Sequence, residues 1–290
     1  MELPLIVGVD GSDSSLRATD WAVDEAARHG LALRLVYASR WENYEGVALG
    51  HELGRPSSQI LAQHIVASTA ERAQRRNPEL KVLTDVVPED TVTALLREAN
   101  GASALVTGSR GRGAIAGRLL GSVSLAVAAR ANCPVIVVRG DDVSIDGRHG
   151  RILLGVSEGA DTEAVRFAFR EAYVRGCTID AVRAWRCPAY ESTDHTRLVS
   201  EPAHVHEERA AALLDKALAD GVREYPSVRV RRTTVEGPAH KVLLQRAAAA
   251  DLTVVGARRQ SGHLGLQLGR VAHALLHHAD CPVAVVPQHL

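Results

Sequence analysis

A glycine-rich stretch with three arginines, residues 108–124, is the part of the sequence best suited to binding an anion. Glycine lets backbone amides approach a ligand closely and adopt positive φ. Ser122 can cap the helix expected after it, so that the amides and dipole of that helix face the same anion. Arginine guanidinium groups add charge-assisted contacts to phosphate. The candidate residues of this phosphate site are Gly108, Ser109, Arg110, Gly111, Arg112, Gly113, Ala114, Arg118, Gly121, Ser122 and Val123.

Three nucleotide motifs compete for this stretch. The chain contains no G-x-x-x-x-G-K-[ST], which disfavours a P-loop NTPase. Residues 111–116 fit G-x-G-x-x-A, but they follow the fourth expected strand instead of the first, and no acidic residue stands at the distance that a dinucleotide site requires. The third pattern is glycine, two residues, glycine, nine residues, then glycine and serine; it is formed by Gly108, Gly111, Gly121 and Ser122.

This third pattern resembles the ATP-binding signature of the universal stress protein family. Residues 7–12 (VGVDGS) resemble the family's first strand, and residues 133–138 (CPVIVV) resemble its last. The resemblance covers both halves of the chain. It implies that ATP is the ligand and that the glycine-rich stretch holds its phosphates, with Arg118 between the loop and the turn at residues 121–123.

The same resemblance implies where the nucleoside lies. Asp10, which follows the first expected strand, would lie beside the adenosine, and backbone near Gly8 and Val36 would line the adenine. An Asx turn before the first helix is the alternative role for Asp10, because aspartate often bonds the backbone two residues further on.

The sequence repeats itself. Residues 133–138 recur at 281–286 with an offset of 148, and residues 6–9 match 153–156 with an offset of 147. A period this long indicates a duplicated domain. The glycine- and aspartate-rich residues 140–150 are typical of a linker, so the domains are expected at 1–140 and 150–290.

Each half alternates apolar runs with helix-like segments. In the first half, strands are expected over residues 5–9, 31–38, 81–87, 104–107 and 134–139, and helices over 15–29, 59–76, 91–100 and 119–131. Strands separated by helices pair in parallel with right-handed crossovers. The fold expected is therefore two tandem, doubly wound, five-stranded parallel-sheet domains, pseudo-two-fold related. The resemblance implies that each is similar to adenine-nucleotide α-hydrolases. It also implies that the two domains pair through residues 134–139 and 282–287.

The second half departs from the first at three positions of the expected site. Arg259 stands in place of Gly111, Arg270 in place of Ser122, and Ser157 in place of Asp10. Arg259 reaches positive φ only at a cost, while Arg270 at a helix N-terminus opposes the dipole and removes a cap. A degenerate nucleotide site is expected, although the added arginines could instead pair with phosphates.

Other segments give weaker signals. His273 and His277 lie four residues apart on one expected helix, where a metal could use them, but an exposed helix in a histidine-rich sequence is the interpretation that we favour. Residues 204–206 are expected in a loop before a helix over 207–219. Residues 41–57 are expected to form a loop over the nucleotide side, and residues 229–232 an exposed basic edge strand.

Composition narrows the class of function. The 34 Lys and Arg residues equal the 34 Asp and Glu residues, so no overall field points to nucleic acid or to an anionic membrane. The apolar runs are shorter than the roughly 20 residues that span a bilayer, and no signal peptide is recognisable. Four cysteines without a C-x-x-C pair indicate reduced thiols and a cytoplasmic protein.

The leading interpretation is a cytoplasmic, ATP-binding regulatory protein of the stress response that lacks catalytic apparatus. ATP, with or without Mg²⁺, is expected mainly in the first domain, and a homodimer and a regulatory protein partner are expected as well. Two alternatives stay open. One is a slow ATP hydrolase in which Asp10 or Ser122 helps to hold Mg²⁺, and the other is a non-catalytic interaction module whose nucleotide is structural.

Overall fold

The computed structural model describes residues 2–39, 57–111, 120–157, 162–186, 202–258 and 268–288, and in these residues ten strands form one sheet. The strands are β1 (Leu5–Gly8), β2 (Leu33–Ala38), β3 (Val82–Val87), β4 (Ala104–Gly108), β5 (Val135–Val138), β6 (Arg151–Gly155), β7 (Thr178–Trp185), β8 (Val230–Glu236), β9 (Leu252–Arg258) and β10 (Val283–Gln288). The helices are α1 (Asp13–His29), α3 (Ser57–Arg76), α4 (Thr91–Ala99), α5 (Ser122–Arg130), α6 (Asp142–Ile145), α7 (Thr162–Arg175), α8 (Ala203–Glu224), α9 (Ala239–Ala247) and α10 (Arg270–His278).

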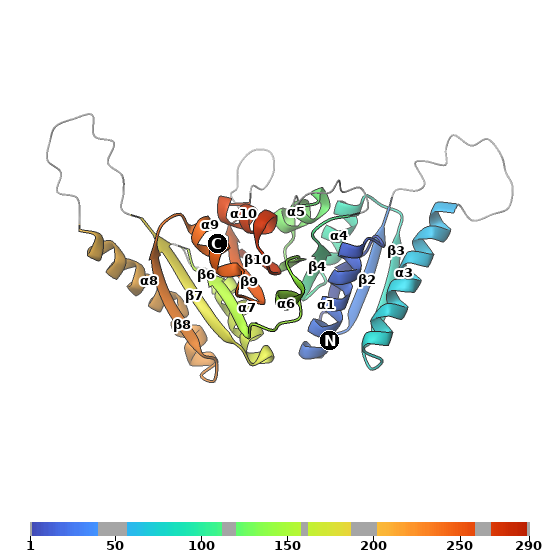
Figure 1. Ribbon diagram of the computed structural model, residues 1–290. Helices are drawn as coiled ribbons and strands as arrows, with labels where there is room; N and C mark the ends of the chain where they lie inside the picture. Colours follow the sequence, from blue (N-terminus) through green and yellow to red (C-terminus); the bar gives the residue numbers. More distant parts are fainter. Residues whose placement is uncertain are drawn as a thin grey trace, which may run out of the picture.

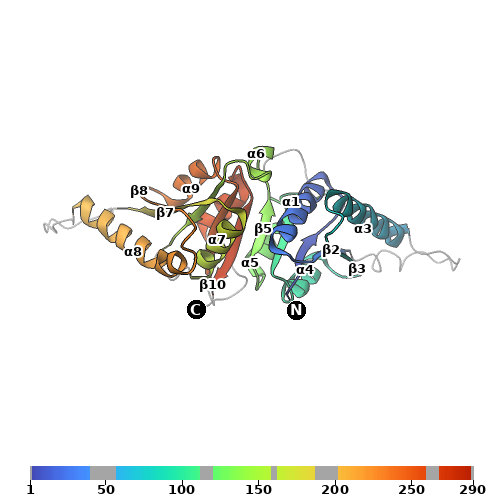
Figure 2. The ribbon, with the colours of Figure 1, turned by 90° about the horizontal axis from the view of Figure 1, so that it is seen from below.

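The strand order is β3-β2-β1-β4-β5-β10-β9-β6-β7-β8, so each half contributes five neighbouring strands. Within each half all pairs are parallel, whereas β5 and β10 pair antiparallel with Ile136 opposite Ala284. Figure 1 shows the two similar lobes on either side of this junction, and Figure 2 shows β5 and β10 in the middle of the molecule. The expected fold class and the expected pairing of the last strands are confirmed.

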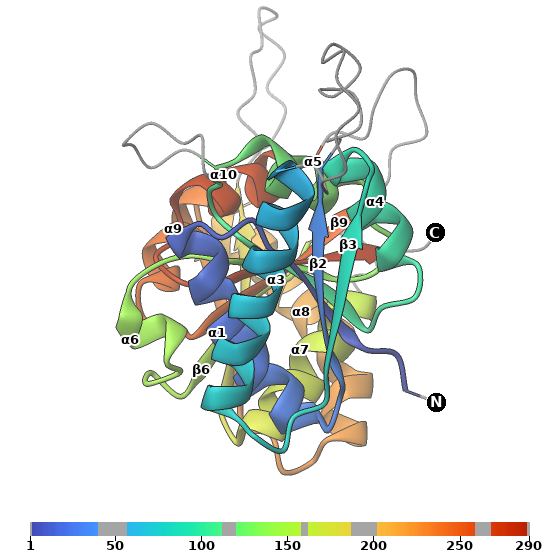
Figure 3. The same cartoon turned by 90° about the vertical axis from the view of Figure 1, so that its right-hand side faces the viewer.

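Helices cover both faces of the sheet because successive strand residues point to opposite sides. In β1, Leu5 and Val7 face α1, whereas Ile6 belongs to the core beneath α4 and α5. Figure 3 shows α1 and α3 on one side of β2 and β3 and α4 on the other. Both apolar cores continue from the first half into the second, so the junction is part of the interior.

The connection between the halves is ordered. Gly140 has φ +94°, and a Cβ there would lie 2.0 Å from the carbonyl oxygen of Asp280. The Asp141 N–H donates to the same carbonyl at 3.3 Å, and Arg17 donates to the Gly140 carbonyl oxygen at 3.3 Å. The segment expected as a linker therefore packs against both halves and includes the short helix α6.

Two expectations on the second half had different outcomes. The expected loop at residues 204–206 is wrong, because α8 begins at Ala203, directly after Pro202. Proline is well placed at a helix start, where its missing N–H costs nothing. The expected basic edge is confirmed: β8 is the last strand of the sheet, and Arg232 pairs with Asp215 at 2.9 Å.

The cysteines that the structure describes carry free thiols. Burial raises the pKa of Cys133 and of Cys177 to about 11 and that of Cys281 to about 12. These three side chains are therefore protonated and poorly reactive at neutral pH. None of the helices in the described ranges is long and apolar enough to cross a membrane.

Candidate functional site

A cavity of about 500 Å³ opens at the carboxyl ends of β1, β2 and β4. Since β1 is flanked by β2 and β4, this is the point where the strand order reverses, which is where open parallel sheets bind ligands. The expected residues that line it are Gly8, Asp10, Val36, Gly108, Arg110, Gly111, Gly121, Ser122 and Val123. Ser109 lies beside it. Arg112, Gly113, Ala114 and Arg118 fall outside the described residues, as does the expected loop except for its last residue, Ser57, which begins α3.

Asp10 organises the turn between β1 and α1. Its Oδ1 accepts hydrogen bonds from the backbone N–H of Ser12 at 2.9 Å and from the Ser12 hydroxyl at 2.6 Å. Ser12 in turn caps α1 by accepting from the Ser15 N–H at 3.2 Å. The Asx turn left open by the sequence is therefore present. It does not exclude a ligand role, because Asp10 also lines the cavity.

Space, and not backbone conformation, selects glycine at two positions of the loop. Neither Gly108 nor Gly111 has positive φ, so the expectation of positive φ at Gly111 is wrong. A Cβ at Gly108 would lie 2.6 Å from the Ser14 carbonyl oxygen, and one at Gly111 would lie 2.7 Å from Asp10 Oδ2. The first turn of α1 thus presses on the start of the loop, and the Arg110 N–H donates to Ser14 Oγ at 3.2 Å.

The start of α5 closes the cavity on its other side. Gly121 is the N-cap and its N–H donates to the Ser109 carbonyl oxygen at 2.9 Å. The cap expected at Ser122 is wrong: Ser122 is the first helical residue, and no side chain caps the helix. Ser124 instead fastens α5 to β4 by donating to the Gly108 carbonyl oxygen at 2.7 Å. The first-turn amides have no intrahelical acceptor, so this end still suits an anion.

Sequence reasoning missed several residues of the cavity wall. Thr107 is 4% exposed, and its Oγ1 has no hydrogen-bond partner among the described residues. A buried hydroxyl without a partner is uncommon, and here it lies in a cavity wall. The available signal was a single polar residue at the end of an apolar strand. The other missed wall residues are Val9, Ser15, Thr91, Leu95, Leu120 and Ser124.

The second half has a cavity of about 520 Å³ at the corresponding place. Ser157 lines it where the first half has Asp10, while Arg259 falls outside the described residues. Gly269 is the N-cap of α10, and Arg270 is its first helical residue. The argument that Arg270 removes a cap is therefore wrong, because neither α5 nor α10 has a side-chain cap.

The histidines of α10 lie close together. The rings of His273 and His277 have centroids 4.4 Å apart, and burial lowers the pKa of His277. His277 Nδ1 accepts from the backbone N–H of Leu120 at 3.5 Å. This pair therefore contacts the loop of the first half, just before α5.

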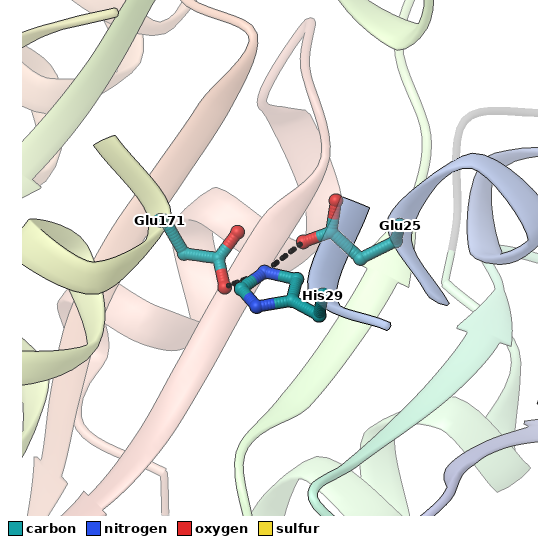
Figure 4. A group of neighbouring side chains, drawn as sticks. All are labelled: Glu25, His29 and Glu171. Atoms are coloured by element: carbon teal, nitrogen blue, oxygen red, sulfur yellow. Dashed lines mark ion pairs between the residues drawn. The ribbon is translucent and has the colours of Figure 1, made fainter. Parts of the chain in front are cut away.

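A buried ionic cluster joins α1 to α7 across the two halves. Figure 4 shows Glu25 and His29 facing Glu171, with His29 Nε2 at 3.0 Å from a Glu171 oxygen and 3.6 Å from a Glu25 oxygen. Arg175 lies at 2.7 Å from Glu25 and 3.2 Å from Glu171. The four side chains are 4–8% exposed.

The pKa values in this cluster follow from burial and from the mutual charges. Burial opposes the His29 imidazolium, but the hydrogen bonds to Glu171 and Glu25 outweigh it and raise the pKa of His29 to about 9. Burial and the nearby Glu25 charge raise the pKa of Glu171 to about 7. Burial also disfavours the Glu25 carboxylate, but Arg175 and its other partners hold the pKa of Glu25 well below its usual value.

The cluster also offers a possible set of metal ligands. Ligand atoms of Glu25, His29 and Glu171 lie within 4.8 Å of one another. However, Arg175 already pairs with one oxygen of each carboxylate. With His29 in its imidazolium form, His29 and Arg175 balance the charges of two carboxylates, so the cluster needs no metal ion for charge balance.

Comparison with known proteins identifies relatives over the whole chain. The model of the universal stress protein family matches residues 3–139 and again residues 149–287. A universal stress protein of Mycobacterium tuberculosis is 35% identical over 295 residues, covering 98% of this chain and 97% of its own length.

The chain is also similar to solved structures. A universal stress protein from Archaeoglobus fulgidus is 15% identical, covers 100% of both chains and superimposes with a TM-score of 0.71, which supports the fold. A universal stress protein solved in complex with cAMP is 32% identical and covers 48% of this chain and 98% of its own, with a TM-score of 0.37.

Proposed function

The chain belongs to the universal stress protein family, and on that premise we propose that it is a cytoplasmic regulatory protein of the stress response whose first half binds ATP. The observation that carries the proposal is the division of one cavity into two chemically distinct ends. Its volume of about 500 Å³ lies within the range of roughly 300–1,000 Å³ that small-molecule sites occupy.

The phosphate end is formed by the glycine loop and the start of α5. The first-turn amides of α5 and the Arg110 side chain supply donors and positive charge. Gly108 and Gly111 leave the backbone bare on this side. A triphosphate carries several negative oxygens, and this end of the cavity fits that charge.

The nucleoside end combines polar and apolar groups. Val36 and Leu95 provide apolar contacts for a flat base, and Leu95 lies against Gly8, where a Cβ would be 3.0 Å from its Cδ1. Asp10 and the buried hydroxyl of Thr107 lie in the same wall and can bond the hydroxyls of a ribose. We propose that these four residues, with the loop, hold the adenosine.

The proposal places one tightly bound ATP in each chain. The second half has Ser157 in place of Asp10 and Val255 in place of Thr107, so both polar groups suited to the ribose are replaced. Where Mg²⁺ accompanies ATP, phosphate oxygens would hold it. A regulatory protein partner and a homodimer are part of the same proposal.

The experiment is native mass spectrometry of the full-length chain as purified, followed by chromatography of the released nucleotide. We expect a mass increase that corresponds to one ATP. A chain that carries no nucleotide and that shows no heat of binding with added ATP would refute the proposal. Turnover of radiolabelled ATP at high protein concentration then distinguishes a regulatory protein from a slow hydrolase.

A further inference from the structure

The second half keeps a cavity at the place where the first half has its proposed nucleotide site. The two volumes are about 520 and 500 Å³, and the second cavity lies at the carboxyl ends of β6, β7 and β9. Protein interiors are close-packed, so a site without a ligand would be free to fill with larger side chains. This cavity has changed its chemistry while its size has stayed the same.

The floor of the second cavity lacks two hydroxyl groups that line the first. At an offset of 148 residues, Thr107 is replaced by Val255 and Thr91 by Ala239. Together with Leu243, these residues give the second cavity an aliphatic floor. Hydroxyl groups of a sugar would be desolvated there without hydrogen-bond partners, which is costly.

The same cavity has gained positive charge. Arg183 stands at the position equivalent to Tyr37, one residue beyond the matched pair Val36 and Val182. Arg183 is 6% exposed, and its Nη1 donates to the Ser157 carbonyl oxygen at 2.6 Å. Arg186 and Arg209 add two further guanidinium groups, and the described lining contains no Asp or Glu.

An aromatic surface borders this positive region. The rings of Trp185 and His206 stack with centroids 6.4 Å apart and an interplanar angle of 15°, and both residues line the cavity. Trp185, which follows Arg183 by two residues, comes from the end of β7, and His206 comes from the first turn of α8. Parallel aromatic planes favour a flat ring as their neighbour.

We propose that the cavity of the second half binds an aromatic organic anion and not a ribonucleotide. The aliphatic floor and the Trp185–His206 surface hold the ring, and Arg183 with the two rim arginines holds the anionic head. The inference concerns the second half alone, so it does not depend on ATP binding by the first.

The test uses isothermal titration calorimetry on the full-length chain, with 2-naphthoate as the probe and neutral 2-naphthylmethanol as its control. We expect naphthoate to bind at least tenfold more tightly than the alcohol. Ser157→Asp places a carboxylate beside Arg183 and should weaken naphthoate binding at least tenfold. The neutral variant Ser157→Asn should keep the affinity, and Ser157 is exposed at the end of β6, where the chain tolerates a change.

A second pair of variants tests the proposal even if the Ser157→Asp chain does not fold correctly. Arg209→Gln removes a guanidinium from the cavity rim and should weaken naphthoate binding, whereas Arg223→Gln on the same helix should not, because Arg223 lies outside the lining and pairs with Asp220. Equal affinity for naphthoate and the alcohol, or unchanged affinity in both Ser157→Asp and Arg209→Gln, would overturn the proposal.

ATP provides the last arm of the test. In a Gly111→Val chain, whose first cavity is blocked, ATP should not displace naphthoate. Displacement at micromolar ATP would show that the second cavity is still a nucleotide site and would also overturn the proposal. Failure of the wild-type chain to bind any ATP would contradict the proposed function and leave the naphthoate result standing.

Discussion

Gly111, in the glycine loop, lies against the turn that holds Asp10, and a side chain at this position would have to displace Asp10 or the loop. A Cβ would lie 2.7 Å from Asp10 Oδ2, so Gly111→Val must push Asp10 or the loop into the cavity. We expect ATP affinity to fall at least tenfold, which corresponds to about 1.4 kcal/mol, with the fold intact because Gly111 follows the end of β4. Calorimetry measures the affinity.

Gly101→Ala is the matched control for that variant. Gly101 lies in the turn before β4, has no positive φ, and would bring a Cβ no closer than 3.8 Å to its nearest neighbour. It should bind ATP as the wild type does. Unchanged affinity in Gly111→Val would mean that this loop does not hold the nucleotide.

Replacing Thr107 by valine should have opposite effects on the free energy of unfolding and on ATP affinity. Its buried hydroxyl lacks a protein partner among the described residues, and such a group costs about 1–3 kcal/mol when unsatisfied. Thr107→Val should therefore leave the free energy of unfolding unchanged or raise it by about 1 kcal/mol. The equivalent position in the second half is already Val255, so valine fits this strand.

Binding should respond in the other direction to the same change. If Thr107 bonds the ligand, losing about 1 kcal/mol lowers ATP affinity about fivefold. Urea unfolding of the ligand-free chain and calorimetry with ATP measure the two effects. A variant that is less stable and binds ATP normally would show that the hydroxyl is structural.

At the scale of helices, α8 depends on a close contact with α7. Gly221 packs so tightly on the Phe169 ring that a Cβ would lie 2.4 Å from Cδ2, and Phe169 is fully buried. Gly221→Ala should lower the free energy of unfolding by about 1–3 kcal/mol through overpacking, although alanine is the better helix former by about 1 kcal/mol. Thermal unfolding measures the net effect.

A second substitution tests the cause of that loss. Phe169→Leu removes the ring atoms that meet the new methyl group, so the double variant should be more stable than the sum of the two single changes predicts. Simple additivity would place the strain elsewhere in α8.

The sequence predicts the strands better than the ends of the helices, and the contact between Gly221 and Phe169 shows why. The strands could be predicted from short apolar runs between helix-like segments, because a parallel strand buried on both faces is a nearly continuous run of apolar residues. The helix expected over residues 207–219 runs instead to Glu224, since Gly221, usually a sign that a helix is ending, is here demanded by Phe169. Ser122 would cap α5 if the helix began one residue later, and the sequence does not determine a helix start to a single residue.

The candidate site also has residues that the sequence identifies and features that it does not. Its glycines and Asp10 belong to a local pattern, so the sequence identifies them. The positive φ expected at Gly111 is wrong, because the space there is limited by the side chain of Asp10, about a hundred positions earlier in the chain. The sequence shows Thr107 only as a polar residue near the end of an apolar strand, since the missing partner of its hydroxyl is a property of the folded chain.

At the scale of the whole molecule, the junction of the halves buries charge as well as apolar surface. Glu25 and His29 lie in α1, whereas Glu171 and Arg175 lie in α7, an offset of 146 residues that makes the pairs equivalent in the duplication. The second half has arginine where the first has histidine. The cluster is therefore asymmetric, and one of its cations, the His29 imidazolium, can lose its proton at about pH 9.

Stability should consequently fall as pH rises from about 5 to 9. The pKa of His29 is raised to about 9, so its stabilising proton is fully bound below its ordinary value of 6.5 and is lost as pH rises through 9. The pKa of Glu171 is raised to about 7, so it too binds a proton more tightly in the folded chain, and that contribution is lost as pH rises through 7. The lowered pKa of Glu25 acts in the opposite sense only below pH 4.5.

His29→Gln tests this directly by urea unfolding between pH 7 and 9. In the wild type, one extra bound proton gives a slope of about 1.4 kcal/mol per pH unit at most, and the variant should lose this slope while also being less stable at pH 7. His64→Gln, at an exposed position of α3, should keep the wild-type slope, because its imidazole lies outside the cluster. An unchanged slope in His29→Gln would mean that the junction does not gain its stability from this proton, and the pH dependence would then have to come from groups elsewhere in the chain.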